Sequence, residues 1–236
     1  MNNLNKIPIH DSSLRHSTGQ AIYIDDMPEQ ENLLHGAPLL SKDACGKIIK
    51  INSDKLQDLP FYTKIITAKD IPGENEIGPI KNGEPILADK FYSYLGQPIA
   101  IVLAKTHQEA IYASSLIEIE TDLTTKPILN LDDAYQQKSF LEDPMVLEKG
   151  NIEKDMSKSD YKLSGDFEMG GQDHFYLETH VAMTFPGENN EYVVWSSTQH
   201  PTEVQHGVGK VLNIPSAKID SKVRRLGGGF GGKESQ

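Results

Sequence analysis

Hydrophobic and polar residues alternate over several short stretches of the first 125 residues, and this period-two pattern predicts β-strands. One stretch has a helical period instead: Ala110, Ala113 and Ile117 fall on one face, and Thr106 and Glu109 have the spacing of a capping box. Strands are predicted within residues 32–41, 47–52, 62–72, 91–105 and 117–123, with a short helix over 53–60 capped by Ser53. We therefore expect a compact α/β unit that ends near residue 125.

Breaker residues and weak periodicity separate this unit from a second one. Residues 72–90 are rich in Gly, Pro, Asn and Glu and predict a long surface loop, and residues 126–160 predict a connector with short helices. A helix is expected over 199–213, since Pro201 suits its first position and Asn213 its C-terminal end. Further strands are expected over 175–185, 191–198 and 217–226. The predicted fold class is α/β, in the wider sense of α+β.

The composition indicates a soluble, acidic protein. The 236 residues carry a formal net charge of −11, with a pI near 5.2, which disfavours binding to nucleic acid or to an anionic membrane. No apolar run approaches the roughly 18 residues that span a bilayer, and the polar N-terminus lacks the apolar core of a secretory signal. We therefore expect a cytoplasmic location. Because Cys45 is the only cysteine, a disulfide within the chain and a four-cysteine iron–sulfur cluster are excluded.

The run RRLGGGFGGKESQ at residues 224–236 raises the main question about function. It matches the G-x-G-x-x-G fingerprint, but the helix and the acid of a dinucleotide site do not follow. It also matches G-x-x-x-x-G-K, but Glu234 stands where a magnesium-binding Ser or Thr is required. A frayed tail and a ligand-binding loop both fit the glycines. Phe230 favours the loop, because a large apolar side chain has no reason to be placed in solvent.

A second segment, MGGQDHFYLETH at residues 169–180, places a polar side chain after paired glycines. Gln172 carries a neutral carboxamide, which can bind an oxo or hydroxyl ligand without adding charge, although an exposed hairpin tip fits the same pattern. His174, Glu178 and His180 do not have the spacing of a zinc motif. We therefore expect no metal to be ligated directly by this protein.

The stretches GGQDHFYLETH, WSSTQHPTEVQ and RRLGGGFGGKES together resemble the molybdenum-binding part of the xanthine dehydrogenases. TGQAIYIDDMP, YLGQPIAIVLA and AIYASSLIEIE are similar to the same family, so the resemblance runs from about residue 12 to the end in family order. The bacterial form with a separate molybdopterin-binding subunit is the most similar. The resemblance implies an arm, an α/β hammerhead domain, a connector and the beginning of a molybdopterin-binding domain, at residues 1–17, 18–125, 126–149 and 150–236.

The resemblance also implies roles for individual residues. Gln172 is expected to approach the oxo ligand of molybdenum, and Gly229, Phe230 and Gly231 to lie against molybdopterin. Glu234 is expected to hydrogen-bond a purine substrate. The pterin dithiolene holds the molybdenum in this family, so the resemblance requires no ligand from the protein.

The complete enzyme implied by the resemblance would be a hetero-oligomer that oxidises hypoxanthine and xanthine to urate. Its electrons would pass to iron–sulfur and FAD centres on partner subunits. The family's general base is expected beyond Gln236, so we expect no catalytic residue in this chain and no activity without the remainder of the molybdenum subunit. Two alternatives remain open: a related molybdenum hydroxylase for aldehydes or N-heterocycles, and a non-catalytic assembly fragment.

Overall fold

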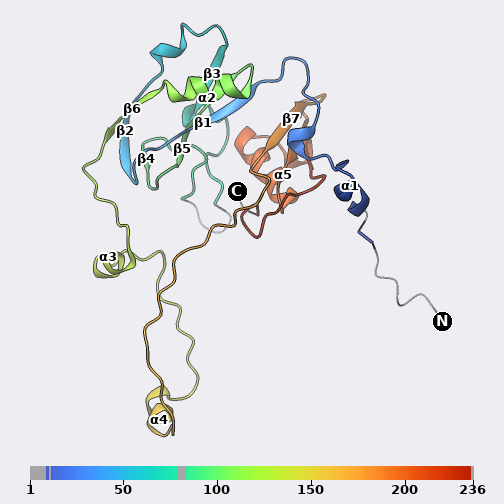
Figure 1. Ribbon diagram of the computed structural model, residues 1–236. Coiled ribbons are helices and arrows are strands. Elements are labelled where there is room, and N and C mark those ends of the chain that lie inside the picture. The colour runs from blue at the N-terminus through green and yellow to red at the C-terminus, as the bar shows by residue number, and fades with distance from the viewer. Residues whose placement is uncertain (1–8, 11, 79–82, 235–236) are drawn as a thin grey trace, which may run out of the picture. The chain divides into compact units, whose positions relative to one another are not determined.

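The computed structural model describes residues 9–10, 12–78 and 83–234. These residues divide into two compact units. The first unit combines the described part of 1–125 with that of 174–236, and the second consists of 126–173. Figure 1 shows the helices and strands of each unit.

A three-stranded antiparallel sheet with one helix against it forms the first part of the larger unit. Strand β5 (Pro98–Ala104) lies between β1 (His35–Leu40) and β3 (Tyr62–Thr67). Helix α2 (His107–Ser115) packs on this sheet (Figure 1). Burying a Val, Leu or Ile side chain contributes about 1.5–3 kcal/mol, so the apolar face between sheet and helix holds this part together. Its buried residues are Leu39, Leu56, Ala100, Val102, Ala113 and Ile117.

A second antiparallel sheet has the order β4 (Phe91–Tyr92), β2 (Gly46–Asn52) and β6 (Glu118–Asp122). Its small core contains Ala88, Tyr92 and Ile99. At Gly46 an added Cβ atom would lie 2.4 Å from the Tyr92 hydroxyl oxygen, so the packed tyrosine leaves room only for glycine.

The third sheet belongs to the second half of the chain. Strand β8 (Tyr192–Ser196) pairs antiparallel with β7 (Ala182–Pro186) and parallel with β9 (Ile219–Lys222). Helix α5 (Pro201–Leu212) makes the crossover between β8 and β9 and contacts β9. Asn213 adopts the left-handed conformation, with φ at 54°, and ends the helix. The predicted start at Pro201 and end at Asn213 are both confirmed.

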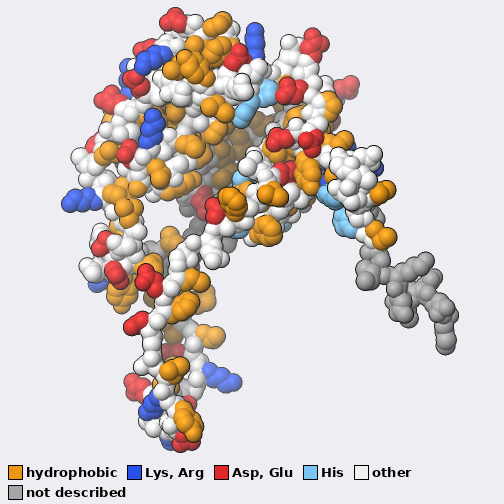
Figure 2. Space-filling model, viewed as in Figure 1, with side chains coloured by type: hydrophobic (Ala, Val, Ile, Leu, Met, Phe, Trp, Pro, Cys, Tyr) orange, Lys and Arg blue, Asp and Glu red, His pale blue; other side chains and the backbone are white. Residues whose placement is uncertain are grey.

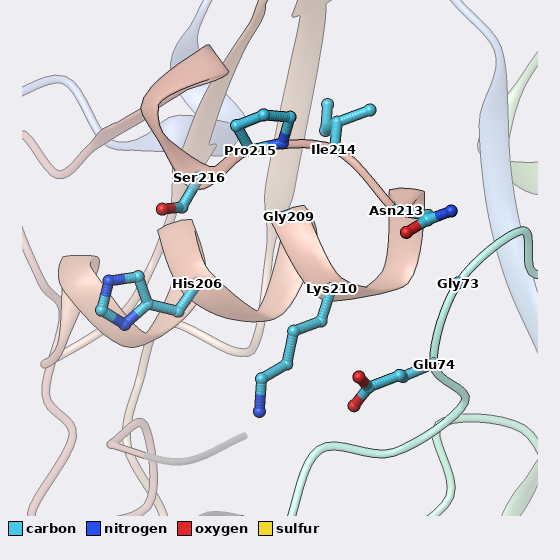
Figure 3. Close-up of a pocket in the computed structure, with 9 residues that line it drawn as sticks. All are labelled: Gly73, Glu74, His206, Gly209, Lys210, Asn213, Ile214, Pro215 and Ser216. Atoms are coloured by element: carbon cyan, nitrogen blue, oxygen red, sulfur yellow. The ribbon is translucent and has the colours of Figure 1, made fainter.

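The C-terminal end of α5 is covered by the segment that follows β3. The amides of Gly73 and Glu74 donate hydrogen bonds to the carbonyl oxygens of Val211 (2.9 Å) and Lys210 (3.1 Å). These carbonyls belong to the last turn, where a helix supplies no ordinary internal donor. A Cβ atom on Gly73 would lie 1.9 Å from the Lys210 oxygen, so the contact requires glycine. Figure 3 shows Gly73 and Glu74 beside this last turn, at the edge of a cavity of about 520 Å³.

The smaller unit, residues 126–173, contains the short helices α3 (Leu131–Gln136) and α4 (Ile152–Ser157). Each begins at an asparagine whose side-chain oxygen accepts a hydrogen bond from the first turn. No residue of this unit is buried, so the unit has no hydrophobic core of its own. Figure 2 shows hydrophobic side chains at the surface of the segment that carries α4. The following residues are 94% or more exposed: Leu141, Met145, Leu147, Tyr161 and Leu163.

One further helix, α1 (Ser13–Ser17), precedes the first sheet and contains no buried residue. Nearby, the carbonyl oxygen of Ile22 accepts a hydrogen bond of 2.9 Å from the Arg225 guanidinium, which ties the N-terminal part of the unit to its C-terminal part. Among the described residues, no helix combines the length and the hydropathy that a membrane span needs.

Several predicted strands are longer than the observed ones. The strand expected over 62–72 ends at Thr67, where a 3-10 turn over Ala68–Asp70 follows it. The strand expected over 175–185 is wrong in its first part, because only Ala182–Pro186 pairs in a sheet. Phe175 has a φ of 45°, which interrupts any extended strand at that point. The strand expected over 217–226 is limited to Ile219–Lys222, because a 3-10 turn precedes it and the chain leaves the sheet afterwards.

Local predictions around Ser53, Thr106 and residues 72–90 also need correction. The Ser53 side chain makes no cap, and the short helix expected there is a single 3-10 turn. Thr106 accepts the amide of Glu109 at 3.2 Å, but the Glu109 carboxylate contacts the Thr106 hydroxyl rather than its amide, so half of the capping box is present. The loop over 72–90 is not wholly at the surface: residues 79–82 lie outside the described residues, and Leu87 and Ala88 are buried.

Candidate functional site

The glycine run folds into an ordered loop of residues 227–234, which we call the glycine loop. Gly228 and Gly231 have φ angles of 99° and 93°, a region that favours glycine. Phe230 also has a positive φ, 53°, and it is 75% exposed. A left-handed backbone at a bulky residue is strained, and an exposed ring gains little from packing. The position of Phe230 is therefore better explained by a contact with a ligand than by the stability of the loop.

Two glycines of this loop lie against side chains from preceding segments. A Cβ atom on Gly227 would lie 2.3 Å from the Cβ atom of Glu178. A Cβ atom on Gly229 would lie 2.4 Å from Oε1 of Gln199. Close packing therefore requires glycine at position 227, whereas a side chain at position 229 would displace the Gln199 carboxamide. Both reasons differ from the positive φ angles of the neighbouring glycines.

The segment between β8 and α5 holds the second half of the glycine loop. Gln199 Oε1 accepts hydrogen bonds from the amides of Gly231 (2.9 Å) and Lys233 (3.3 Å). The Lys233 carbonyl oxygen accepts hydrogen bonds from the Gln199 amide at 2.8 Å and the Thr198 hydroxyl at 3.1 Å. These bonds connect the loop to the third sheet and make it an ordered part of the unit.

The first half of the glycine loop is held by Glu178. Its Oε2 atom accepts a hydrogen bond of 2.7 Å from the Gly227 amide and forms an ion pair of 3.1 Å with Lys233 Nζ. The Lys233 ammonium also lies 4.8 Å from the centroid of the Tyr176 ring, within the range of a cation–π contact. Glu178 therefore contacts both ends of the glycine loop, and Tyr176 contacts the end at Lys233.

The tip of the glycine loop presents backbone donors. In the described part of the chain, the amides of Gly228, Gly229 and Phe230 have no acceptor. Consecutive amides in a backbone that alternates between negative and positive φ form a concave site for anions. Gly229 is buried, but Gly228 and Phe230 are not, so their two amides can bind oxygen atoms of an anionic or strongly polar group, with the Phe230 ring as an apolar neighbour.

Glu234, at the end of the glycine loop, is exposed and lines a cavity of about 340 Å³. One side of this cavity comes from helix α5 and another from the segment that follows β3. A cavity of this size, with an apolar wall and the carboxylates of Glu76, Glu203 and Glu234 in its lining, suits a small ring-shaped ligand that carries hydrogen-bonding groups. The apolar residues that line it are Ile77, Ile86, Val204, Val208 and Val211.

The residues predicted for the site fall in two units. Gly229, Phe230, Gly231 and Glu234 lie together in the glycine loop of the larger unit. Gln172 is an exposed residue of the smaller unit, in a stretch without helix or strand. The roles assigned to these five residues remain predictions.

Sequence reasoning missed the residues that support the glycine loop, which are Glu178, Gln199 and Lys233. No spacing rule connects them, because their contacts span 32 to 55 residues of sequence. Glu178 was considered above only as part of a zinc motif, yet its carboxylate binds the Gly227 amide and the Lys233 ammonium. Among the described residues, no group of three or more His, Cys, Asp or Glu side chains is arranged to hold a metal ion.

Partial burial lowers the pKa of His180, and the positive charge of Lys233 lowers it further. The imidazole ring also makes an edge-to-face contact with the Tyr176 ring, with centroids 5.3 Å apart. His180 therefore lies close enough to the buried lysine to report on it.

We expect an NMR titration of the chain to give His180 a pKa below the ordinary value of 6.5 and to give a higher pKa in Lys233→Met, which lacks the nearby charge. The folded chain binds this proton less tightly than the unfolded chain, so the free energy of unfolding should decrease as pH falls below about 6.5. Lys222→Met removes an exposed charge elsewhere and should leave the pKa of His180 unchanged. An unchanged pKa in Lys233→Met would contradict this reading.

Two family models match the chain. The hammerhead domain of aldehyde oxidase and xanthine dehydrogenase matches residues 18–123. The molybdopterin cofactor-binding domain matches residues 134–236, which include the glycine loop and Gln172. Molybdopterin is therefore the cofactor of the domain to which these residues belong.

The chain is similar both to xanthine dehydrogenases and to aldehyde oxidases, the two enzymes named in the hammerhead model. A xanthine dehydrogenase of Calliphora vicina is 38% identical over 97% of this chain, and aldehyde oxidase 2 of Macaca fascicularis is 39% identical over 95%. The chain spans only 17% and 16% of their lengths. In fold, the crystal structure of quinoline 2-oxidoreductase from Pseudomonas putida 86 aligns with a TM-score of 0.82 at 23% identity, over 96% of this chain and 31% of that one.

The two matched models follow one another in the predicted order, so the predicted fold of a hammerhead domain followed by molybdopterin-binding sequence is confirmed. The matches to both models and the identity to the curated relatives agree on one family. The chain belongs to the aldehyde oxidase and xanthine dehydrogenase family of molybdenum-dependent oxidoreductases, and it carries the hammerhead domain and a molybdopterin cofactor-binding domain of that family.

Proposed function

We propose that an enzyme containing this chain hydroxylates purines, converting hypoxanthine and xanthine to urate. The observation that carries the proposal is the position of Glu234, whose carboxylate lines a cavity beside the glycine loop. A carboxylate can accept hydrogen bonds from the ring N–H groups of a purine, and the valines of α5 supply an apolar wall for the ring.

The glycine loop fits the cofactor of this family. Molybdopterin carries several oxygen and nitrogen atoms, and the amides of Gly228 and Phe230, which have no acceptor among the described residues, are donors for such atoms. Gly231 leaves space on its outer side, since an added Cβ atom would meet nothing within 4 Å. We assign Gly229, Phe230 and Gly231 to the cofactor, together with the exposed carboxamide of Gln172, which can donate to an oxo group.

The reaction replaces a C–H bond by a C–OH bond with oxygen from water, and it releases two protons and two electrons. Molybdenum, when bound through molybdopterin, supplies the oxygen transfer and accepts the two electrons. The residues of this chain bind and orient the substrate. Phe230 forms part of the apolar wall of the site, and Glu234 fixes the orientation of the purine. We place the general base outside these 236 residues, and we expect a protein of these residues alone to be inactive, since the chain spans 17% of a relative's length.

The proposal also covers the domain boundaries of the chain and the partner subunits of the complete enzyme. The hammerhead domain is assigned to residues 18–125, after an arm at 1–17, and the molybdopterin domain begins at 150, after a connector at 126–149. The electrons would pass to iron–sulfur and FAD centres on partner subunits, in a cytoplasmic hetero-oligomer. The exposed hydrophobic side chains of 126–173 support the presence of further protein, because such surfaces are normally covered.

Oxidation of aldehydes or N-heterocycles is the second candidate, and the similarity to an aldehyde oxidase favours it. A third candidate, a non-catalytic assembly fragment, is favoured by the smaller unit, which has no core. An aromatic aldehyde offers the carboxylate of Glu234 no ring N–H group, and a non-catalytic fragment would bind no substrate there.

The test is a substrate profile of the enzyme that contains this chain, purified with its cofactors and assayed with an artificial electron acceptor. We expect kcat/KM for xanthine and hypoxanthine to exceed that for benzaldehyde by about tenfold or more, since a lost buried hydrogen bond costs about 1–3 kcal/mol. A preference for benzaldehyde would overturn the proposal in favour of the second candidate. Absence of molybdenum from the purified complex would favour the third.

A further inference from the structure

Lys233 is buried to a degree that lysine side chains rarely reach. Its exposed fraction is 0%, and it is the one charged residue among the described residues that are buried. An ammonium group loses strong hydration when it is buried, so a fully buried lysine needs a partner of opposite charge. The neighbouring Glu234 is exposed, so the two adjacent charges lie in different environments.

The partner of Lys233 is also the partner of Gly227. One oxygen of Glu178, Oε2, accepts the Gly227 amide at 2.7 Å and the Lys233 ammonium at 3.1 Å. These two donors stand at the first and the seventh residue of the glycine loop. A single carboxylate oxygen therefore joins the two ends of the loop, and Phe230 lies midway between them. We call the contact between Glu178, Gly227 and Lys233 the clasp.

The clasp depends on both charges. The Glu178 side chain is 9% exposed, and its other oxygen, Oε1, is buried and accepts no hydrogen bond from the described part of the chain. The carboxylate therefore has little water and few donors to compensate its charge if the lysine is removed. Removal of one member of a buried ion pair is costly for this reason, whereas neutral replacement of both members is tolerated much better.

We propose that Lys233 is a positioning residue, whose buried ammonium closes the glycine loop through Glu178 and thereby fixes where Phe230 and Glu234 lie. The closure of the loop follows from the contacts of this chain alone. Its effect on cofactor and substrate rests on the proposed function.

The first experiment measures hydrogen–deuterium exchange of the 236-residue chain, read on the peptide that covers the glycine loop. The loop amides of Gly227, Gly231 and Lys233 have acceptors, so they should be protected while the loop is closed. In Lys233→Met we expect their exchange to accelerate by about 100-fold or more, up to the unprotected limit. Glu178→Gln keeps an acceptor for the Gly227 amide but leaves the buried Lys233 ammonium without its counter-charge, so it should accelerate exchange as well. Lys222→Met, which removes an exposed lysine paired with Asp220, should have no effect.

The double variant Lys233→Met with Glu178→Gln distinguishes charge pairing from filling of space. It leaves no uncompensated charge, so exchange should be slower than in Lys233→Met by about tenfold or more. A double variant that exchanges as fast as Lys233→Met would overturn the ion-pair argument. Unchanged exchange in both single variants would overturn the clasp. If strand β5 also exchanges rapidly in Lys233→Met, the lysine supports the whole unit, and that variant contradicts a local clasp. The result for Glu178→Gln then decides between a local clasp and support of the whole unit.

The second experiment uses the enzyme that contains this chain. We expect Lys233→Met to lower its molybdenum content, measured by elemental analysis, and the double variant to restore part of it. In Glu178→Gln, a displaced Glu234 should raise KM for xanthine by more than it lowers kcat, whereas a loss of folded protein would lower kcat alone. Equal molybdenum content and unchanged KM in all variants would overturn the positioning role. If the exchange results hold but the parent enzyme does not oxidise purines, the proposed function fails and the clasp stands.

Discussion

Replacing Gly227 with Ala should open the glycine loop and remove the cofactor from the enzyme. The added Cβ atom would lie 2.3 Å from the Glu178 Cβ atom and 3.2 Å from its backbone nitrogen, and neither atom is the end of a flexible side chain. The backbone must therefore shift, which lengthens the bond of 2.7 Å between the Gly227 amide and the Glu178 carboxylate. Overpacking costs about 1–3 kcal/mol and a hydrogen bond to a charged group about 1.5–3 kcal/mol. We expect a loss of roughly 2–4 kcal/mol in the local stability of the loop.

Limited proteolysis and hydrogen exchange of the 236-residue chain measure this loss. Cleavage after Arg224 or Arg225 should become faster in Gly227→Ala, while peptides of β1 and β5 keep their protection. Gly165→Ala is the matched control, because its added Cβ atom meets nothing within 4 Å and its φ is not positive. A Gly227→Ala protein as resistant as the parent would show that Glu178 can move without cost. In the enzyme that contains the chain, molybdenum content should fall in Gly227→Ala and not in the control.

Elements with signals close together in the sequence could be predicted well. Helix α5 is the clearest case, because Pro201 and Asn213 mark its two ends and neither signal depends on distant contacts. Strand β5 followed by α2 was likewise predicted, since the pattern changes from alternating to helical at Thr106. In these regions local preference and tertiary packing favour the same structure.

The glycine loop shows what the sequence could not reveal. By composition it resembles a frayed tail, and glycine does lose the most backbone entropy on ordering. The loop is nevertheless held by Glu178 and Gln199, which lie 32 or more residues away in the sequence. For the same reason residues 175–181 do not form the predicted strand: the Glu178 amide donates a hydrogen bond of 3.3 Å to the Gly227 carbonyl oxygen, outside any sheet. Side-chain contacts at such separation leave no periodic pattern to read.

Glu234→Val should separate a substrate-binding carboxylate from an ordinary surface charge. Glu234 is exposed in the described part of the chain, yet it lines the cavity between α5 and the segment after β3. If a purine occupies that cavity, loss of the carboxylate leaves a polar atom of the purine without its partner, at a cost of about 1–3 kcal/mol. We therefore expect kcat/KM for xanthine to fall roughly ten- to a hundredfold. Benzaldehyde has no such polar atom, so its kcat/KM should stay the same or rise.

The control is Glu203→Val, which removes another carboxylate from the lining of the same cavity. Glu203 lies in the first turn of α5, where its charge favours the helix by a few tenths to about 1 kcal/mol, so the substitution costs little stability. If the negative potential of the cavity alone attracts the substrate, both variants should lower kcat/KM for xanthine equally. If Glu234 binds the ring directly, only Glu234→Val should lower kcat/KM for xanthine, mainly by raising KM.

Equal losses for xanthine and benzaldehyde in Glu234→Val would indicate a damaged loop, because the clasp at Lys233 is the immediate neighbour of this residue. No loss for either substrate would make Glu234 a solvated surface charge, whose ion pairs are worth little.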